Sequence, residues 1–248
     1  VGPRVIPYLK KALDEAIEAN DMKRQVVLAQ ALAMYESSYG VSVLIREIEK
    51  ELTQAGDELP RRDNDIAYTQ LPPDHGAMPD VCYLLYSLGM TRDARSIPIW
   101  REVAEKINPS VESLKDMFIG TFYYVDAVCY GIERLVDPQC IEILEKLYSY
   151  DYLRNQKRTG GIEPDYFKER QAMLELSIVR ALARCGEKKG YQVLIDYLND
   201  TRSLLAEQAH TELKLITGKD FQKNQVEWTN YIESIVPGTT RILSKSLV

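Results

Sequence analysis

The sequence predicts an all-α fold, an α–α superhelix of about five stacked helical hairpins with two loop insertions and a C-terminal capping helix. Three observations support this prediction. One short pattern recurs five times, apolar stripes with helical spacing lie between its copies, and strand signals are nearly absent. The chain has neither an Asn-Gly nor an Asp-Gly hairpin turn. The 248 residues therefore correspond to stacked helix pairs rather than to separate domains.

The recurring pattern marks the start of one helix in each hairpin. Its copies lie at spacings close to those of two-helix repeats of roughly 40 to 47 residues, lengthened in places by insertions. The copies are RVIPYLKKAL anchored at Ile6, YGVSVLIREI at Val41, RSIPIWREVA at Ile97, QCIEILEKLY at Ile141 and KGYQVLIDYL at Tyr191.

A second helix is predicted between successive copies, because apolar residues recur there at i, i+3 and i+4 spacing and so share one helical face. Two such stripes are Leu174, Ile178, Leu182 and Cys185, and Leu205, Ala209, Leu213 and Ile216. Each stripe provides a face that packs against the neighbouring helix.

Turn and capping residues divide the chain in the same way. Asp137-Pro138 and Asn108-Pro109 each predict a helix start, since an acceptor side chain at the N-cap is followed by a proline at the first helical position. Glycines favour positive φ and end helices readily. Four of them are predicted near the ends of preceding helices: Gly40, Gly89, Gly131 and Gly186.

Composition excludes several classes of function. Hydrophobic residues make up 45% of the 248 residues and charged residues 27%, as in an ordinary folded protein. The net charge of −6, with both signs interspersed, argues against nucleic acid as a partner. No stretch approaches the roughly 18 uninterrupted apolar residues of a membrane span.

The four cysteines lack the spacing that metal or dithiol chemistry requires, since the sequence contains neither a CxxC motif nor a Cys/His cluster. Each lies in an apolar helical segment: Cys82, Cys129, Cys140 and Cys185. We therefore expect four buried core residues, and no metal site on this chain.

Three segments, GPRVIPYLKKAL, TRDARSIPIW and CGEKKGYQVLIDYL, resemble HEAT-like repeats, in which the second helix opens with a charged or small residue, two aliphatics and often a proline. The resemblance covers essentially the whole chain. Residues 217–236 look like the closing cap of such arrays, where an ITGKDF-type turn leads into a helix containing Trp228. It implies one HEAT-like repeat domain over residues 1–248, acting as a non-catalytic scaffold or docking domain.

A narrower resemblance rests on MPDVCYLLYSLGMTRDARSIPIW, FYYVDAVCYGIERL and EPDYFKERQAMLELSIVRALARCG. These segments look like the C-terminal helical region of certain bacterial FAD-dependent oxidoreductases, whose flavin-binding part lies upstream. The present chain departs from the full pattern, because it has no GxGxxG after a strand. The resemblance implies FAD in the parent protein and no cofactor on this chain.

The first residue is Val1, and a structured segment follows at once. We therefore expect the chain to be cut from a longer protein, whose missing N-terminal part, or another protein, is its partner. The compartment stays open for the same reason.

The first insertion, residues 56–80, is the longest loop, and loops of this length are usually functional or disordered. It contains five candidate residues: Arg61, Arg62, Tyr68, Asp74 and His75. In one interpretation the two arginines grip a carboxylate or phosphate, while the Asp-His pair acts as acid and base. In the other, the segment is a solvated loop extended by prolines.

The second insertion, residues 153–166, begins with basic residues next to Gly160 and Gly161. Arg154 and Arg158 are its candidate binding residues. They would form an anion-binding lid in one interpretation and part of a mobile connection in the other.

The predicted helix 122–131 carries Asp126 among apolar and aromatic residues, including Tyr123. A carboxylate there needs a partner, and we expect an arginine from a neighbouring helix. Asp126 is thus either an acid with a perturbed pKa or a polar tie between repeats. An alternative function follows, a stand-alone small-molecule enzyme or ligand-binding protein with its site between the 56–80 insertion and this helix.

Overall fold

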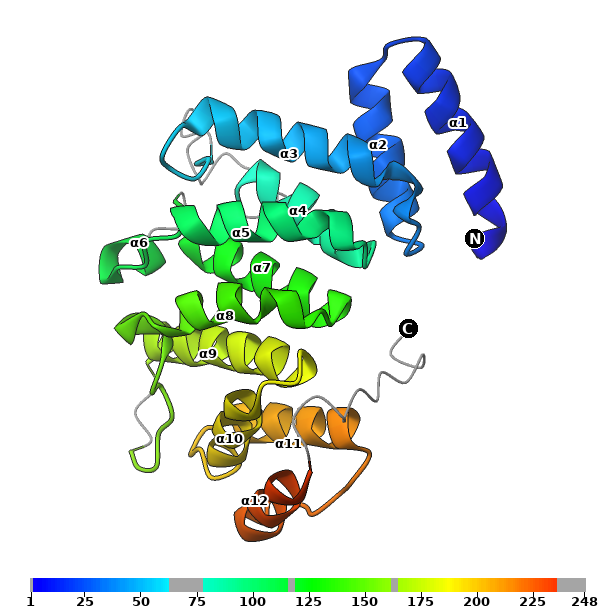
Figure 1. Ribbon diagram of the computed structural model, residues 1–248. Coiled ribbons are helices and arrows are strands. Elements are labelled where there is room, and N and C mark those ends of the chain that lie inside the picture. Colours follow the sequence, from blue (N-terminus) through cyan, green and yellow to red (C-terminus); the bar gives the residue numbers. More distant parts are fainter. Residues whose placement is uncertain (1, 63–77, 116–118, 162–164, 236–248) are drawn as a thin grey trace. The chain divides into compact units, whose positions relative to one another are not determined.

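A computed structural model describes residues 2–62, 78–115, 119–161 and 165–235 (Figure 1). Twelve α-helices and several short 3₁₀ turns account for the regular structure, and no strand occurs within those ranges. The all-α prediction is confirmed. The repeat pattern predicts one domain, and the contacts divide the chain into two compact units, residues 1–135 and 136–248.

The described residues of unit 1 form seven helices in two rows. In one row α2 packs against α4 and α4 against α7, and in the other α3 packs against α5. The helices are α1 (Ile6–Glu18), α2 (Met22–Ala33), α3 (Val41–Ala55), α4 (Asp80–Met90), α5 (Ile97–Lys106), α6 (Val111–Lys115) and α7 (Thr121–Leu135).

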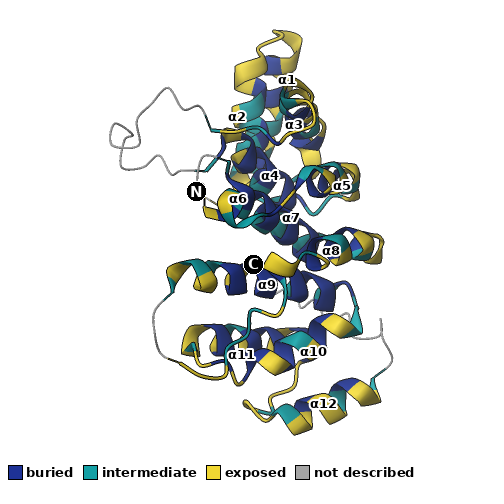
Figure 2. Ribbon diagram, turned by 90° about the vertical axis from the view of Figure 1, so that its left-hand side faces the viewer, coloured by how far each residue is buried: buried dark blue, intermediate teal, exposed yellow. Residues whose placement is uncertain are grey.

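In unit 2, the part of the chain that the structure describes forms five helices. They are arranged around α9, which packs against α8, α10 and α11, while α10 also packs against α12. In both units the buried residues lie on the faces that neighbouring helices turn toward one another (Figure 2). The helices are α8 (Ile141–Tyr148), α9 (Tyr166–Arg184), α10 (Lys188–Tyr197), α11 (Ser203–Thr217) and α12 (Gln225–Ser234).

The recurring sequence pattern corresponds to a recurring corner. A residue with positive φ ends each preceding segment, and the next residue caps the new helical segment by accepting a hydrogen bond from the amide two positions later. The positive-φ residues are Glu36, Arg92, Val136 and Gly186, and the caps are Ser37, Asp93, Asp137 and Glu187. Four α-helices begin at a predicted anchor residue: Ile6, Val41, Ile97 and Ile141.

A small buried residue precedes the anchor in each of these corners, and packing explains why. A Cβ on Gly40 would lie 2.7 Å from Ala29, and one on Gly190 would lie 2.4 Å from the backbone nitrogen of Ala183. Ser96 and Cys140 fill the same position in the other two corners and are also buried. The two glycines thus allow α3 to pack closely against α2, and α10 against α9.

One predicted helix end is wrong, because Gly131 lies inside α7, which continues to Leu135. Gly89 does lie near the end of α4, as predicted, one residue before Met90. The two helices cross closely at these glycines. A Cβ on Gly89 would lie 2.9 Å from the Cα of Gly131, and a Cβ on Gly131 would lie 2.4 Å from the Trp100 ring. These glycines therefore permit close helix packing. Gly186, with φ of 92°, does follow the end of α9 as predicted.

One predicted helix start is also displaced. Asn108-Pro109 does not begin a helix, because α6 starts at Val111 and its first turn is capped by two serines. The Ser110 amide donates to the Ser113 hydroxyl at 2.8 Å, and the Ser113 amide donates to the Ser110 hydroxyl at 3.0 Å. This reciprocal pair satisfies the free amides at the helix start better than the upstream asparagine could.

The predicted tryptophan helix near the C-terminus forms as α12. Trp228 is fully buried, and its ring lies 4.9 Å from that of Phe221 in an edge-on arrangement. The indole nitrogen donates to the Gln222 carbonyl at 2.7 Å. The turn that precedes α12 is therefore fastened to it through one side chain.

All four cysteines are buried, as predicted. Burial raises the pKa of the Cys82 thiol, so this residue stays protonated and unreactive at neutral pH. The cysteines belong to the core rather than to a reactive site.

Candidate functional site

The first insertion is described only at its two ends. Tyr68, Asp74 and His75 lie outside the described residues, so the proposed acid–base pair is not placed. Arg61 pairs with Glu58 at 3.0 Å on the surface. Arg62 is half-buried.

The start of this insertion is held against unit 1 helices. The Tyr124 hydroxyl of α7 donates to the Pro60 carbonyl at 2.6 Å, and Lys106 of α5 donates to the Leu52 and Gly56 carbonyls. The insertion and α7, between which the alternative site was expected, therefore meet at this point. The bond that joins them also occupies the Tyr124 hydroxyl.

Asp126 lies half-buried on α7 and accepts a hydrogen bond from Tyr86 of α4 at 2.5 Å, a tyrosine in the place where an arginine was expected. Burial raises the pKa of Tyr86, and the charge of Asp126 raises it further. The tyrosine therefore remains protonated and acts as a donor. Tyr123, beside Phe122 at a ring distance of 5.6 Å, is half-buried on the same helix.

The Tyr86–Asp126 pair continues into a larger set of contacting side chains. The Tyr86 ring lies 5.5 Å from the Tyr130 ring, and the Arg134 guanidinium lies 5.3 Å from the Tyr130 centroid. Arg134 also pairs with Glu36, which in turn pairs with Arg92 at 3.1 Å. We call these six half-buried residues the arginine–tyrosine cluster: Glu36, Tyr86, Arg92, Asp126, Tyr130 and Arg134.

The charges in this cluster are unevenly matched. Arg92 and Arg134 share a single oxygen of Glu36, and the Nε atoms of both arginines are buried without a hydrogen-bond partner in the described part of the chain. Two guanidinium groups carry ten N–H donors between them. One carboxylate cannot satisfy so many donors, and the cluster therefore retains donor capacity for an incoming acceptor.

Sequence reasoning missed this cluster apart from Asp126, although a signal was present. Glu36 and Arg92 occupy the same position in two copies of the recurring corner, one residue before the cap. Arg134 lies four residues after Tyr130, on the same face of α7 as Asp126. The position before the cap in successive corners is therefore the sequence signal that relates Glu36 to Arg92.

The second insertion is anchored as far as Arg158. Arg154 pairs with Asp151, and its Nε donates to that carboxylate at 3.0 Å. The Arg158 amide donates to Asp200 at 2.8 Å, and the Thr201 amide donates to the Arg158 carbonyl at 2.9 Å. These bonds fix residues 154–158 along the turn between α10 and α11, so this part is no freely mobile connection.

A buried carboxylate holds the same segment from the other side. Glu175, only 1% exposed, accepts hydrogen bonds from the Tyr148 and Tyr197 hydroxyls at 3.1 and 2.6 Å. It also accepts the Asn155 and Gln156 amides, both at 2.7 Å. Burial, and then the charge of Glu175, raise the pKa of both tyrosines. Both tyrosines therefore stay protonated and, with the two backbone amides, remain donors to Glu175.

Asp200 completes this anchor. Burial acts to raise its pKa, but hydrogen bonds from Arg202 and the Arg158 amide outweigh burial and hold the pKa below its ordinary value. Arg202 pairs with Asp200 at 2.7 Å and donates to the Gln156 carbonyl at 2.7 Å. The carboxylates of this region thus serve to fix the backbone.

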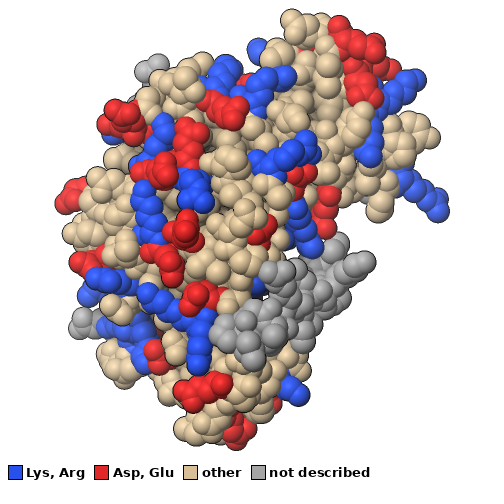
Figure 3. Space-filling model, viewed as in Figure 1, with Lys and Arg blue, Asp and Glu red and all other residues tan. Residues whose placement is uncertain are grey.

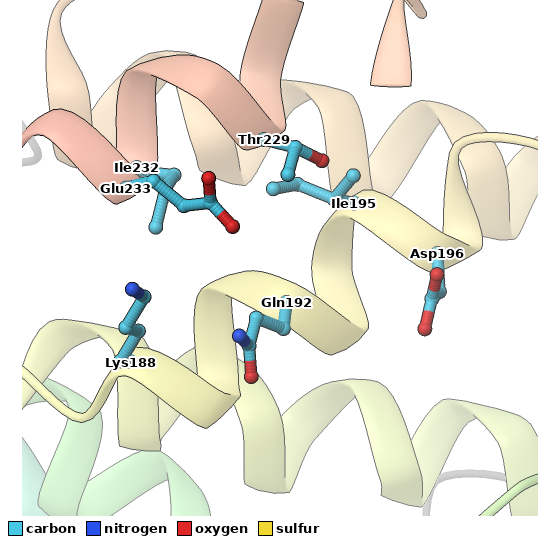
Figure 4. A pocket seen from close by; sticks show the side chains of 7 residues that line it. All are labelled: Lys188, Gln192, Ile195, Asp196, Thr229, Ile232 and Glu233. Carbon is cyan, nitrogen blue, oxygen red and sulfur yellow. The ribbon is translucent and has the colours of Figure 1, made fainter. Parts of the chain in front are cut away.

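A groove of about 340 Å³ lies between α10 and α12 in unit 2, and sequence reasoning missed it (Figure 4). The two helices run antiparallel. Gln225, at the start of α12, donates to the Ile195 carbonyl at 2.7 Å and accepts from Asn199 at 2.6 Å. These bonds close one end of the groove. The lining residues are Lys188, Gln192, Ile195, Asp196, Thr229, Ile232 and Glu233.

His210 of α11 is a hydrogen-bonded structural residue. Its Nε2 lies 3.0 Å from Asp220, which also pairs with Lys214 at 2.6 Å. Among the described residues, no group of three or more His, Cys, Asp or Glu side chains has the geometry to hold a metal ion. Within that same part of the chain, no helix is both long and apolar enough to cross a membrane.

No protein-family model, curated protein or solved structure matches the chain. The candidate sites therefore rest on the residues and contacts described above.

Proposed function

We propose that the chain is a HEAT-like helical scaffold that docks a partner protein on the arginine–tyrosine cluster of unit 1. The supporting observation is the unbroken run of contacts from Tyr86 to Arg92, which joins α4 and α7 to the corners that follow α2 and α4. Tyrosine and arginine dominate the residues that carry binding energy at protein interfaces. The four repeated corners support the repeat architecture, since each has the same sequence of a positive-φ residue followed by a capping side chain.

The partner that fits this cluster presents an acidic side chain. Arg92 and Arg134 together have more donors than Glu36 can satisfy, and a second carboxylate would pair with a guanidinium in a charge-assisted, two-pronged manner. The face shown in Figure 3 carries interleaved basic and acidic side chains, an arrangement that does not suit the regular phosphates of nucleic acid. An acidic peptide segment is therefore the proposed ligand class.

Selection from a displayed peptide library tests this proposal. Peptides selected on the chain should be enriched in Asp or Glu beside apolar residues, and Arg92→Met or Arg134→Met should weaken their binding about tenfold. Arg24→Met is the matched control, because Arg24 is an exposed arginine of α2 outside the cluster. Selected peptides without acidic enrichment would overturn the proposal. So would cluster variants that both bind the peptides as tightly as the parent chain does.

The resemblance to oxidoreductase C-terminal regions supports a second part of the proposal, namely that the parent protein binds FAD upstream of this chain. The protein expressed from the complete gene should then show flavin absorbance, while residues 1–248 alone should not. A complete protein without flavin absorbance would contradict this part and leave the peptide-docking proposal unaffected.

A further inference from the structure

The groove between α10 and α12 has two ends of different character. Gln225 closes one end through bonds to α10, whereas at the other end Lys188 of α10 and Glu233 of α12 face each other across the opening (Figure 4). Ile195 and Ile232, both nearly fully buried, form the apolar floor between these ends. The groove therefore combines an aliphatic floor with one cation and one anion at this end, while Asp196, the other charged lining residue, lies toward the opposite end (Figure 4).

Both charges are available to a ligand. Within the described residues, neither Lys188 nor Glu233 takes part in an ion pair or a side-chain hydrogen bond. A direct ion pair between two such partly exposed groups would contribute little, because water screens it. A ligand that pairs with both residues therefore has no strong Lys188–Glu233 ion pair to break.

The arrangement discriminates between kinds of ligand. A simple anion would pair with Lys188 but would meet repulsion from Glu233, while a simple cation would leave Lys188 unmatched. A ligand that carries a cationic and an anionic group close together satisfies both residues, and an aliphatic body would cover the two isoleucines. A volume of about 340 Å³ is at the small end of ligand pockets, which favours a compact molecule.

We propose that the α10–α12 groove binds a small zwitterion with an aliphatic body, of the chemistry of a free branched-chain α-amino acid. Lys188 pairs with the ligand carboxylate, Glu233 pairs with its ammonium group, and Ile195 and Ile232 contact its side chain.

An NMR titration of the full chain with L-leucine tests this assignment. Amide signals of α10 and α12 should shift, and two analogues that each lack one charge, N-acetyl-L-leucine and L-leucinamide, should bind about tenfold more weakly. Failure of L-leucine to shift these signals, or equal binding of the three compounds, would overturn the proposal.

Variants locate the site independently of the ligand series. Lys188→Met and Glu233→Gln should each weaken leucine binding about tenfold, and Thr229→Trp should abolish it by filling the groove. Lys23→Met, at an exposed lysine of α2 in unit 1, should leave binding unchanged. Circular dichroism should show that all four variants remain folded, because the changed side chains make no described ion pair. Folded Lys188 and Glu233 variants that bind leucine like the parent would contradict the proposal.

Discussion

Glu36 in unit 1 and Glu175 in unit 2 are both carboxylates on which several donors converge, but their surroundings differ. Glu175 is 1% exposed and meets four neutral donors, two tyrosine hydroxyls and two backbone amides. The Glu36 side chain is 30% exposed and meets two arginines that both retain unused donors. A carboxylate with every acceptor site matched stabilises its own fold, whereas a carboxylate outnumbered by donors leaves a site open to a partner.

The largest effect is expected for Glu175→Gln. The new amide group must face at least one backbone N–H of Asn155 or Gln156, and a backbone N–H cannot turn away or become an acceptor. We expect the free energy of unfolding to fall by about 1–3 kcal/mol, the range for buried donors left without acceptors. Urea denaturation followed by circular dichroism measures this loss.

The control for this change is Glu145→Gln, at an exposed glutamate of α8 in the same unit. It makes the same chemical change without burial, so its unfolding midpoint should match that of the parent. If Glu175→Gln proved as harmless as the control, Glu175 would not be the anchor of the 154–158 segment.

A smaller effect on stability is expected for Glu36→Gln. The side chains of Arg92 and Arg134 are 33% and 19% exposed, and ion pairs of this partly solvated kind contribute at most about 1 kcal/mol. High salt should reduce the difference between parent and variant in urea denaturation. The same salt should leave the effect of Glu175→Gln nearly unchanged, because Glu175 is paired with neutral donors.

Peptide binding should respond in the opposite direction to stability in the Glu36→Gln variant. Because an uncharged amide would no longer neutralise the two guanidinium groups, acidic peptides selected on the parent should bind the variant as well or better, by up to about tenfold. Titration of one selected peptide against both proteins measures the change. A clear loss of affinity would mean that Glu36 itself contacts the partner.

The sequence was sufficient to predict the helices and insufficient to predict the sites. Anchor residues such as Ile97 mark helix starts because apolar spacing and caps act over a few positions. Glu175 is one polar residue beside the apolar stripe of α9. Its partners become visible only where residues 154–158 pack against that helix. Contacts that join segments far apart along the chain carry no local signal.

The lack of a local signal for long-range contacts also explains why some candidate residues were predicted and others were not. Asp126 was singled out because a carboxylate in an apolar stripe is visible locally, yet its tyrosine donor on α4 was not foreseen. Lys188 and Glu233 were missed, since nothing around either residue indicates that α12 returns to lie along α10. Residue type predicts that a partner is needed, whereas packing decides which partner is met.

The smallest effect is expected for Asp220→Asn, a third carboxylate whose side chain is 35% exposed. Lys214 is the main cause that lowers the pKa of Asp220 to about 2, followed by the Gln222 amide and His210. A carboxylate with a lowered pKa stabilises the fold above its ordinary pKa of 3.8, and that stabilisation disappears as the pH falls through about 2. The thermal midpoint of the variant should therefore lie slightly below that of the parent from neutral pH to about pH 4, and the two should converge between about pH 4 and pH 2. A gap that persisted at pH 2 would show that packing, rather than the charge of Asp220, joins α11 to the turn before α12.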